Sequence, residues 1–189
     1  MPLDVTCDDS CAAAADVALT RWGRIDAVIH AAGITRDAIL ARQHLDDWEA
    51  VFDVNLEGAR RLGRATLPLL SGQGRGGHWI GIGSHAGLVG SAGQAAYAAS
   101  KAALHGLMLS WAHEFAPDNV RVNTVLPGVL PTPMTESLDP EVMRSYARAN
   151  VLGRINDPAE VARFVAFLLT TANISGQAFS LDSRIHRWA

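Results

Sequence analysis

A serine, a tyrosine and a lysine stand at spacings that suit proton transfer to a carbonyl oxygen. Ser84 follows an apolar run, Tyr97 lies thirteen residues further on, and Lys101 follows after another four. Positions i and i+4 share one face of a helix, so a helix here would bring the Lys101 ammonium near the Tyr97 phenol. A neighbouring positive charge lowers the pKa of a phenol toward the range that a general acid or base needs. We therefore expect Tyr97 to exchange a proton with a substrate oxygen that Ser84 holds.

A structural reading of the same pair stays open. A tyrosine and a lysine four residues apart on a helix occur by chance in many proteins, where the tyrosine ring is half-buried packing. The serine spacing, the strand-like run before Ser84 and a ring of small residues favour catalysis, because small neighbours leave the approach to the phenol open. These small residues are Gly93, Ala95, Ala96, Ala98 and Ala99.

The elements that must position this site alternate along the chain. Apolar runs predict strands at residues 25–32, 78–83, 120–126 and 178–181. Amphipathic stretches predict helices at 10–22, 45–70, 95–115 and 158–170. This alternation predicts an α/β fold with a doubly wound parallel sheet. Ligands bind such sheets beyond the carboxyl ends of the strands, where Gly33, Ser84 and Pro127-Gly128 are expected to lie.

Composition narrows the class of protein. The 189 residues are 49% hydrophobic and 19% charged, with a formal charge of −3 and no run of one sign. This balance predicts a single globular domain with no nucleic-acid surface and no membrane span. The first residues lack the pattern of a signal peptide, so a cytoplasmic location is expected. Cys7 and Cys11 are too few for a disulfide scaffold or a zinc site, and no metal is expected.

The spacing of Ser84, Tyr97 and Lys101 resembles the active-site pattern of the short-chain dehydrogenase/reductase family. Further agreement lies in Asp4-Val5-Thr6, His30-Ala31-Ala32-Gly33, Asn55, Asn123 to Gly128 with Thr132, and Ile174 to Gln177. The resemblance spans residues 3 to about 182 and implies one Rossmann-like domain over residues 1–189. Within the family, residues 33–37 and 152–154 look most like those of beta-ketoacyl-ACP reductases.

The resemblance implies NADP- or NAD-dependent reduction of a carbonyl to an alcohol. Tyr97 would donate the proton, Lys101 would lower the pKa of Tyr97 and hold the nicotinamide ribose, and Ser84 would orient the carbonyl. Asn55 would hold a water that links Lys101 to solvent. The cofactor-contacting residues that the resemblance implies are Asp4, Val5, Ala31, Ala32, Gly33, Tyr97, Lys101, Pro127, Gly128 and Thr132.

One family segment is not found in this sequence. Members normally begin with a strand, a glycine-rich turn that approaches the cofactor pyrophosphate, a helix and a second strand. Asp4 would belong at the end of the third strand, so we expect an N-terminally truncated domain that lacks its first two strands and helices. The strand at 25–32 then becomes a sheet edge. The chain is a piece of a longer reductase, a subunit whose partner supplies the rest, or a cofactor-deficient homologue that serves as a non-catalytic binding or assembly module.

The substrate and partners follow from the same resemblance. The substrate is expected to be a small-molecule carbonyl or an acyl group on an acyl carrier protein, such as 3-oxoacyl-ACP. Arg75 matches a carrier-docking position that we expect near the site entrance, whereas Asp118 at a second such position would repel an acidic carrier. We expect a homo-oligomer formed through the two long helices. Its candidate contacts are Ala102, Leu109 and Trp111, and Trp188 in the tail is expected to be a core or oligomer contact and not a substrate contact.

Overall fold

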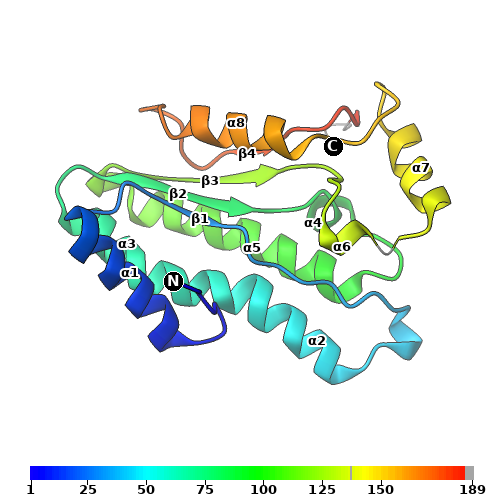
Figure 1. The fold of residues 1–189 in the computed structure, drawn as a ribbon, viewed down its shortest axis with the longest axis horizontal. Helices are drawn as coiled ribbons and strands as arrows, with labels where there is room; N and C mark the ends of the chain where they lie inside the picture. Colours follow the sequence, from blue (N-terminus) through cyan, green and yellow to red (C-terminus); the bar gives the residue numbers. More distant parts are fainter. Residues whose placement is uncertain (137, 186–189) are drawn as a thin grey trace.

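The computed structural model describes residues 1–136 and 138–185 and contains one parallel sheet (Figure 1). Its strands are β1 (Ala27–His30), β2 (Gly77–Ile82), β3 (Val120–Leu126) and β4 (Ala178–Ser180). They pair in the order β1-β2-β3-β4, all parallel. All four predicted strands are confirmed with slightly different ends. Trp188 lies outside the described residues.

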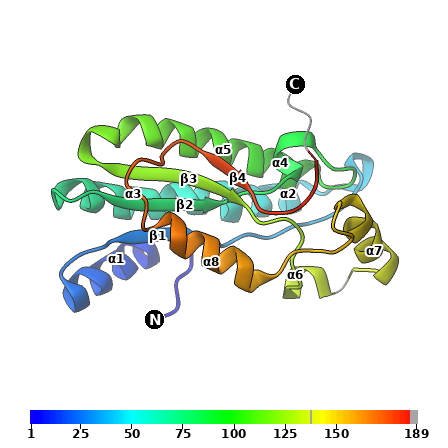
Figure 2. The same ribbon diagram turned by 90° about the horizontal axis from the view of Figure 1, so that it is seen from above.

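Helices cover both faces of the sheet, which confirms the doubly wound arrangement. The helices are α1 (Asp8–Trp22), α2 (Leu45–Phe52), α3 (Gly58–Gly72), α4 (Ala86–Val89), α5 (Ala95–Glu114), α6 (Pro133–Glu136), α7 (Pro140–Ala149) and α8 (Pro158–Leu168). α1, α3 and α5 lie on one face and α8 lies on the other (Figures 1 and 2). Within the part of the chain that the structure describes, no helix is both long and apolar enough to cross a bilayer.

The predicted helix at 45–70 is interrupted by a π-helical turn. α2 passes into η2 (Asp53–Glu57), which has π geometry, and then into α3. A π turn holds one residue more than an α turn and is frequent at functional sites. Asn55 lies in this turn and is buried.

The larger core lies between the sheet and the layer of α1, α3 and α5. Trp79 of β2 is fully buried, and Trp111 of α5 meets it edge-on with ring centroids 5.1 Å apart. Gly63 of α3 makes room for Trp111, because a Cβ at this position would overlap the indole ring. Trp111 is therefore mainly a core residue, and its contact with a second subunit stays a prediction.

A smaller core lies between the sheet and α8. Ile80 of β2 and Val125 of β3 are fully buried there against Val161 and Leu168 of α8. β1 is different, because it pairs with β2 alone among the described strands and its residue Ile29 is 43% exposed. The predicted edge strand is thus observed.

Candidate active site

The predicted catalytic side chains gather at the carboxyl edge of the sheet. Ser84 follows the end of β2, and Tyr97 and Lys101 lie on the first turns of α5. α4 connects the two elements and packs very closely on α5, since a Cβ at Gly87 would lie 2.9 Å from the backbone of Lys101. This close approach holds Ser84 beside the tyrosine.

Lys101 is almost completely buried and points at the end of β2. Its ammonium donates a hydrogen bond of 2.8 Å to the carbonyl oxygen of Ile82. The same nitrogen lies 5.7 Å from the centre of the Tyr97 ring. Burial lowers the pKa of Lys101 from 10.5 to about 8, because the charged form loses its hydration.

The Tyr97 phenol behaves differently from the expectation. Burial raises the pKa of Tyr97, the hydrogen bond with Ser84 lowers it in part, and the charge of Asp37 adds a smaller increase. The pKa of Tyr97 therefore lies above the ordinary value of a phenol and not below it, as the i, i+4 spacing predicted. The physical reason is burial, which penalises the charged phenolate.

Asn55 joins three separate segments at the site. Its amide oxygen accepts the Ile34 backbone N–H at 2.8 Å, and its amide nitrogen donates to the Ile34 carbonyl and to the Ser100 hydroxyl, each at 3.0 Å. Ser100 in turn donates to the Tyr97 carbonyl at 2.8 Å. Asn55 therefore fixes the loop after β1 relative to α5. This keeps the four predicted catalytic residues, Asn55, Ser84, Tyr97 and Lys101 (the tetrad), in one place.

His30, the last residue of β1, also belongs to this neighbourhood. It is 1% exposed and stacks on Trp79 with ring centroids 6.1 Å apart. Burial lowers the pKa of His30 to about 4, with the Lys101 charge as the second cause. The imidazole is thus neutral at pH 7 beside the catalytic groups.

The cofactor-contacting positions form two groups in the structure. Ala31, Ala32 and Gly33 form the loop after β1, and a Cβ at Gly33 would lie 3.4 Å from both the Asn55 amide oxygen and the Lys101 amine. Pro127, Gly128 and Thr132 follow β3; Gly128 needs a positive φ of 77° and abuts Asp182. Both loops lie at the carboxyl edge, as predicted.

Asp4 and Val5 lie at the start of the chain, next to α3. The Asp4 carboxylate accepts the backbone N–H and the hydroxyl of Thr6 at 2.9 and 2.7 Å, and these bonds lower its pKa. Val5 is buried against Gly58, where a Cβ would lie 2.7 Å from the valine side chain. The aspartate therefore stabilises a turn into α1, and its role toward the adenine ring stays a prediction.

The residues present fit the nicotinamide-ribose end of a dinucleotide. An ammonium has three N–H donors, and Lys101 uses one of them on Ile82. Two donors are left for ribose hydroxyls. The glycine at position 33 lets backbone approach this amine without a side chain between them.

Comparisons with known proteins agree with this geometry. A family model described as enoyl-(acyl carrier protein) reductase matches residues 1–185. The chain is 40% identical over 183 residues to the 3-oxoacyl-[acyl-carrier-protein] reductase FabG of Thermotoga maritima, an alignment that covers 95% of this chain and 74% of the relative. It is 37% identical to the enzyme of the same name from Vibrio cholerae, over 98% of this chain and 77% of that protein. It is 41% identical to carbonyl reductase family member 4 of Danio rerio, over 85% and 65%.

These matches run through both strand-end loops, η2 and α5, and therefore through every residue of the tetrad. The structure agrees with these matches, because it has a parallel α/β sheet with Ser84, Tyr97 and Lys101 clustered at its edge. The chain belongs to the short-chain dehydrogenase/reductase family of NAD(P)-dependent oxidoreductases.

Proposed function

We propose that the chain reduces the keto group of a 3-oxoacyl thioester carried by an acyl carrier protein, with Tyr97 as the general acid. The observation that carries the proposal is the position of the Tyr97 phenol between the Ser84 hydroxyl and the Lys101 ammonium. The names of the Thermotoga maritima and Vibrio cholerae relatives support the substrate class. Bound NADPH or NADH would supply the hydride, which no side chain can provide.

The electrostatics of the site suit proton donation. Because the pKa of Tyr97 is raised, its phenol stays protonated at neutral pH and is ready to protonate a developing alkoxide. Lys101, with a pKa of about 8, is mostly charged at pH 7 and stabilises the phenolate left behind. The Ser84 hydroxyl donates a hydrogen bond to the carbonyl oxygen and polarises it.

Return of the proton to Tyr97 requires a path to solvent. The proposed path runs from Lys101 through a water held near Asn55. The amide oxygen of Asn55 and the amine of Lys101 face the same side of Gly33, each 3.4 Å from where a Cβ would lie. The rigid bonding of Asn55 to Ile34 and Ser100 supports a positioning role of this kind. The loss of these bonds would misplace the water and slow the proton return.

The described structure bears on carrier docking in one respect. Arg75 precedes β2 at the amino end of the strand, whereas Ser84 follows its carboxyl end. Six residues of strand separate these ends by about 17 Å. Arg75 therefore does not lie beside the catalytic edge, where it was expected to lie. The carrier part of the proposal therefore rests on the relatives, and Arg75 serves as a remote contact at most.

Steady-state reduction of matched substrates tests the proposal. The assay compares 3-oxoacyl-ACP, the same acyl group on a small thioester, a 2-enoyl-ACP and a small ketone, each with NADPH and with NADH. Tyr97→Phe should lower kcat by about 10²-fold to 10⁴-fold, with a thermal unfolding midpoint close to that of the parent chain. Ser110→Ala, an exposed change on the same helix, should leave both values unchanged.

Each result of this comparison is informative. Preference for the small ketone would replace the carrier substrate with the second candidate, a small-molecule carbonyl, which the name of the Danio rerio relative favours. Preference for the enoyl substrate would contradict carbonyl reduction. Fluorescence titration with NADPH and NADH addresses the non-catalytic alternative directly, since saturable binding is incompatible with a cofactor-deficient module.

A further inference from the structure

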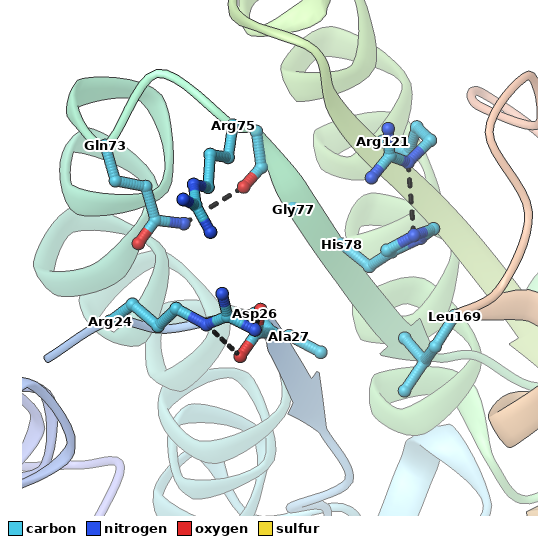
Figure 3. Close-up of a pocket in the computed structure, with 10 residues that line it drawn as sticks. Arg24, Asp26, Ala27, Gln73, Arg75, Gly77, His78, Arg121 and Leu169 are labelled. Atoms are coloured by element: carbon cyan, nitrogen blue, oxygen red, sulfur yellow. Dashed lines mark hydrogen bonds and ion pairs between the residues drawn. The ribbon is translucent and has the colours of Figure 1, made fainter. Parts of the chain in front are cut away.

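Arg61 of α3 differs from the surface arginines of this chain. At the amino edge of the sheet, for example, Arg24 pairs with Asp26 at 3.0 Å, and 49% of the Arg24 side chain is exposed (Figure 3). Exposed ion pairs of this kind contribute little to stability. The Arg61 side chain is only 16% exposed, and its guanidinium donates to two backbone carbonyls as well as to a carboxylate. A side chain bonded in this way fixes backbone segments relative to one another.

The first of these segments is the π turn that contains Asn55. Nη2 of Arg61 donates to the Asp53 carboxylate at 2.6 Å, and Nη1 donates to the Asp53 carbonyl at 3.3 Å. The same carbonyl accepts the backbone N–H of Gly58, five residues further on, which is the bond that defines a π turn. Both lone pairs of the Asp53 carbonyl are therefore used. Without the guanidinium, the first carbonyl of the wide turn would lose one of its two donors.

The second segment lies at the start of the chain. Nη1 of Arg61 also donates to the carbonyl of Val5 at 3.4 Å. Val5 is buried, and its side chain packs against Gly58, where a Cβ would lie 2.7 Å away. The Asp4-Val5 segment, which the family resemblance assigns to the adenine end of the cofactor, is thus joined to the residues that begin and follow the π turn.

We propose that Arg61 is a positioning residue for Asn55: it holds the π turn in the form from which the buried Asn55 amide reaches its partners. These partners, the backbone of Ile34 and the hydroxyl of Ser100, belong to other segments and lie 2.8 to 3.0 Å from the amide. A small displacement of the turn therefore breaks these bonds. The catalytic consequence rests on the proposed function, because a displaced Asn55 would slow the return of the proton to Tyr97.

Arg60 provides a matched control on the same helix. Its Nε donates to the Glu57 carboxylate of the same π turn at 2.6 Å, the length of the pair between Arg61 and Asp53. The Arg60 side chain is 43% exposed, and among the described residues it bonds no backbone carbonyl. Arg60→Gln and Arg61→Gln each remove one guanidinium and one ion pair with the turn. Only Arg61→Gln also removes the bonds to the carbonyls.

Amide hydrogen exchange of the full chain, followed by NMR, tests the position of Asn55 without cofactor or substrate. The backbone N–H of Ile34 donates to the Asn55 amide oxygen, so its protection reports that bond. Arg61→Gln should accelerate exchange at Ile34 about tenfold relative to the parent chain. Arg60→Gln should change it by less than about twofold, since an exposed ion pair contributes little.

A reference amide separates positioning from a general loss of stability. The N–H of Gly83 donates to the Val125 carbonyl at 2.8 Å, at the same edge of the sheet. Equal acceleration at Ile34 and Gly83 would overturn the proposal, and so would equal exchange at Ile34 in the two arginine variants. If Arg61→Gln fails to fold, Arg61→Lys replaces it. Lysine keeps the charge but lacks the planar fork that bonds the carboxylate and the carbonyls together, so exchange at Ile34 should still be selectively faster.

Kinetics provide a second readout for the catalytic consequence. If the parent chain reduces its substrate, Arg61→Gln should lower kcat about tenfold and leave KM within about twofold, because the groups that contact the carbonyl are unchanged. An unchanged kcat would overturn the catalytic consequence. If the parent chain shows no reduction, the proposed function fails, and exchange at Ile34 still decides whether Arg61 positions Asn55.

Discussion

Lys101 donates a hydrogen bond of 2.8 Å to the carbonyl of Ile82, the last residue of β2. This bond ties the catalytic helix to the carboxyl edge of the sheet and fixes the amine under the Tyr97 ring. It also holds an ammonium in a place where water barely reaches. The buried charge of Lys101 therefore lowers the stability of the fold, whereas the proposed proton transfer requires that charge.

The first prediction concerns the pH dependence of stability. The pKa of Lys101 is about 8 in the folded protein, and in the unfolded chain it has the ordinary lysine value of 10.5. Between these values the unfolded chain binds more protons, so the free energy of unfolding should rise with pH. From pH 8 to pH 10 the rise is about 2 kcal/mol. Urea denaturation across this range should show it in the parent chain and not in Lys101→Met; an identical slope in both would contradict the assignment.

A second prediction concerns Asn55. Asn55→Ala leaves the two backbone groups of Ile34 and the Ser100 hydroxyl without their partner in a fully buried place. The free energy of unfolding should fall by about 2–4 kcal/mol. Ser110→Ala, at an exposed hydroxyl on α5, should change it by less than about 0.5 kcal/mol. Chemical denaturation of both variants checks the difference, and similar values would show that the three bonds contribute little.

A pair of glycine substitutions tests the packing of the helical layer. Glycine to alanine in a helix normally stabilises by about 1 kcal/mol, and Gly106→Ala on α5 should do so because nothing lies within 4 Å of the new Cβ. Gly63→Ala on α3 should instead destabilise by about 1–3 kcal/mol, since the methyl group overlaps Trp111. Thermal unfolding midpoints that shift in opposite directions are the expected result. A stabilised Gly63→Ala variant would mean that Trp111 readily moves aside.

The last prediction concerns assembly. We propose a homo-oligomer formed through the exposed sides of α3 and α5, where Leu109 is 37% exposed. Leu109→Glu should shift the mass measured by light scattering toward that of a monomer, because a buried unpaired charge disfavours an interface. Val17→Glu, at a similarly exposed apolar residue on α1, serves as the control and should not. A monomeric parent chain at micromolar concentration would refute the proposal.

Periodicity predicted most of the architecture. The runs at 78–83 and 120–126 are mainly apolar, with Arg121, Asn123 and Thr124 as polar residues in the second, and they became the largely buried strands β2 and β3. Strand ends then placed Ser84, Gly33 and Pro127 at one edge, because parallel strands share their direction. α7 has a clear start signal in Asp139-Pro140, where the aspartate caps the helix through the N–H of Glu141, yet none of the four predicted helices covers it.

Other features depend on contacts that a linear pattern does not encode. Trp111 lies on the same stretch as Leu109, and only the space at Gly63 determines that its ring turns inward. The direction of the Tyr97 pKa shift depends on how deeply the phenol is buried, and the i, i+4 spacing does not reveal that burial. The π turn at Asp53–Glu57 likewise left no mark in a stretch that reads as one continuous helix.

Because of that π turn, the number of residues between α2 and α3 determines where the Asn55 amide lies. One residue removed from positions 53–57 would restore an uninterrupted α-helix and rotate α2 by about 100° relative to α3. Helix content would be preserved, and the hydrophobic contacts of α3 would remain in register. The Asn55 amide, however, would leave the Ile34 loop and Ser100. A one-residue gap here between two otherwise alignable sequences would therefore move the Asn55 amide away from the position that the proposed proton path requires.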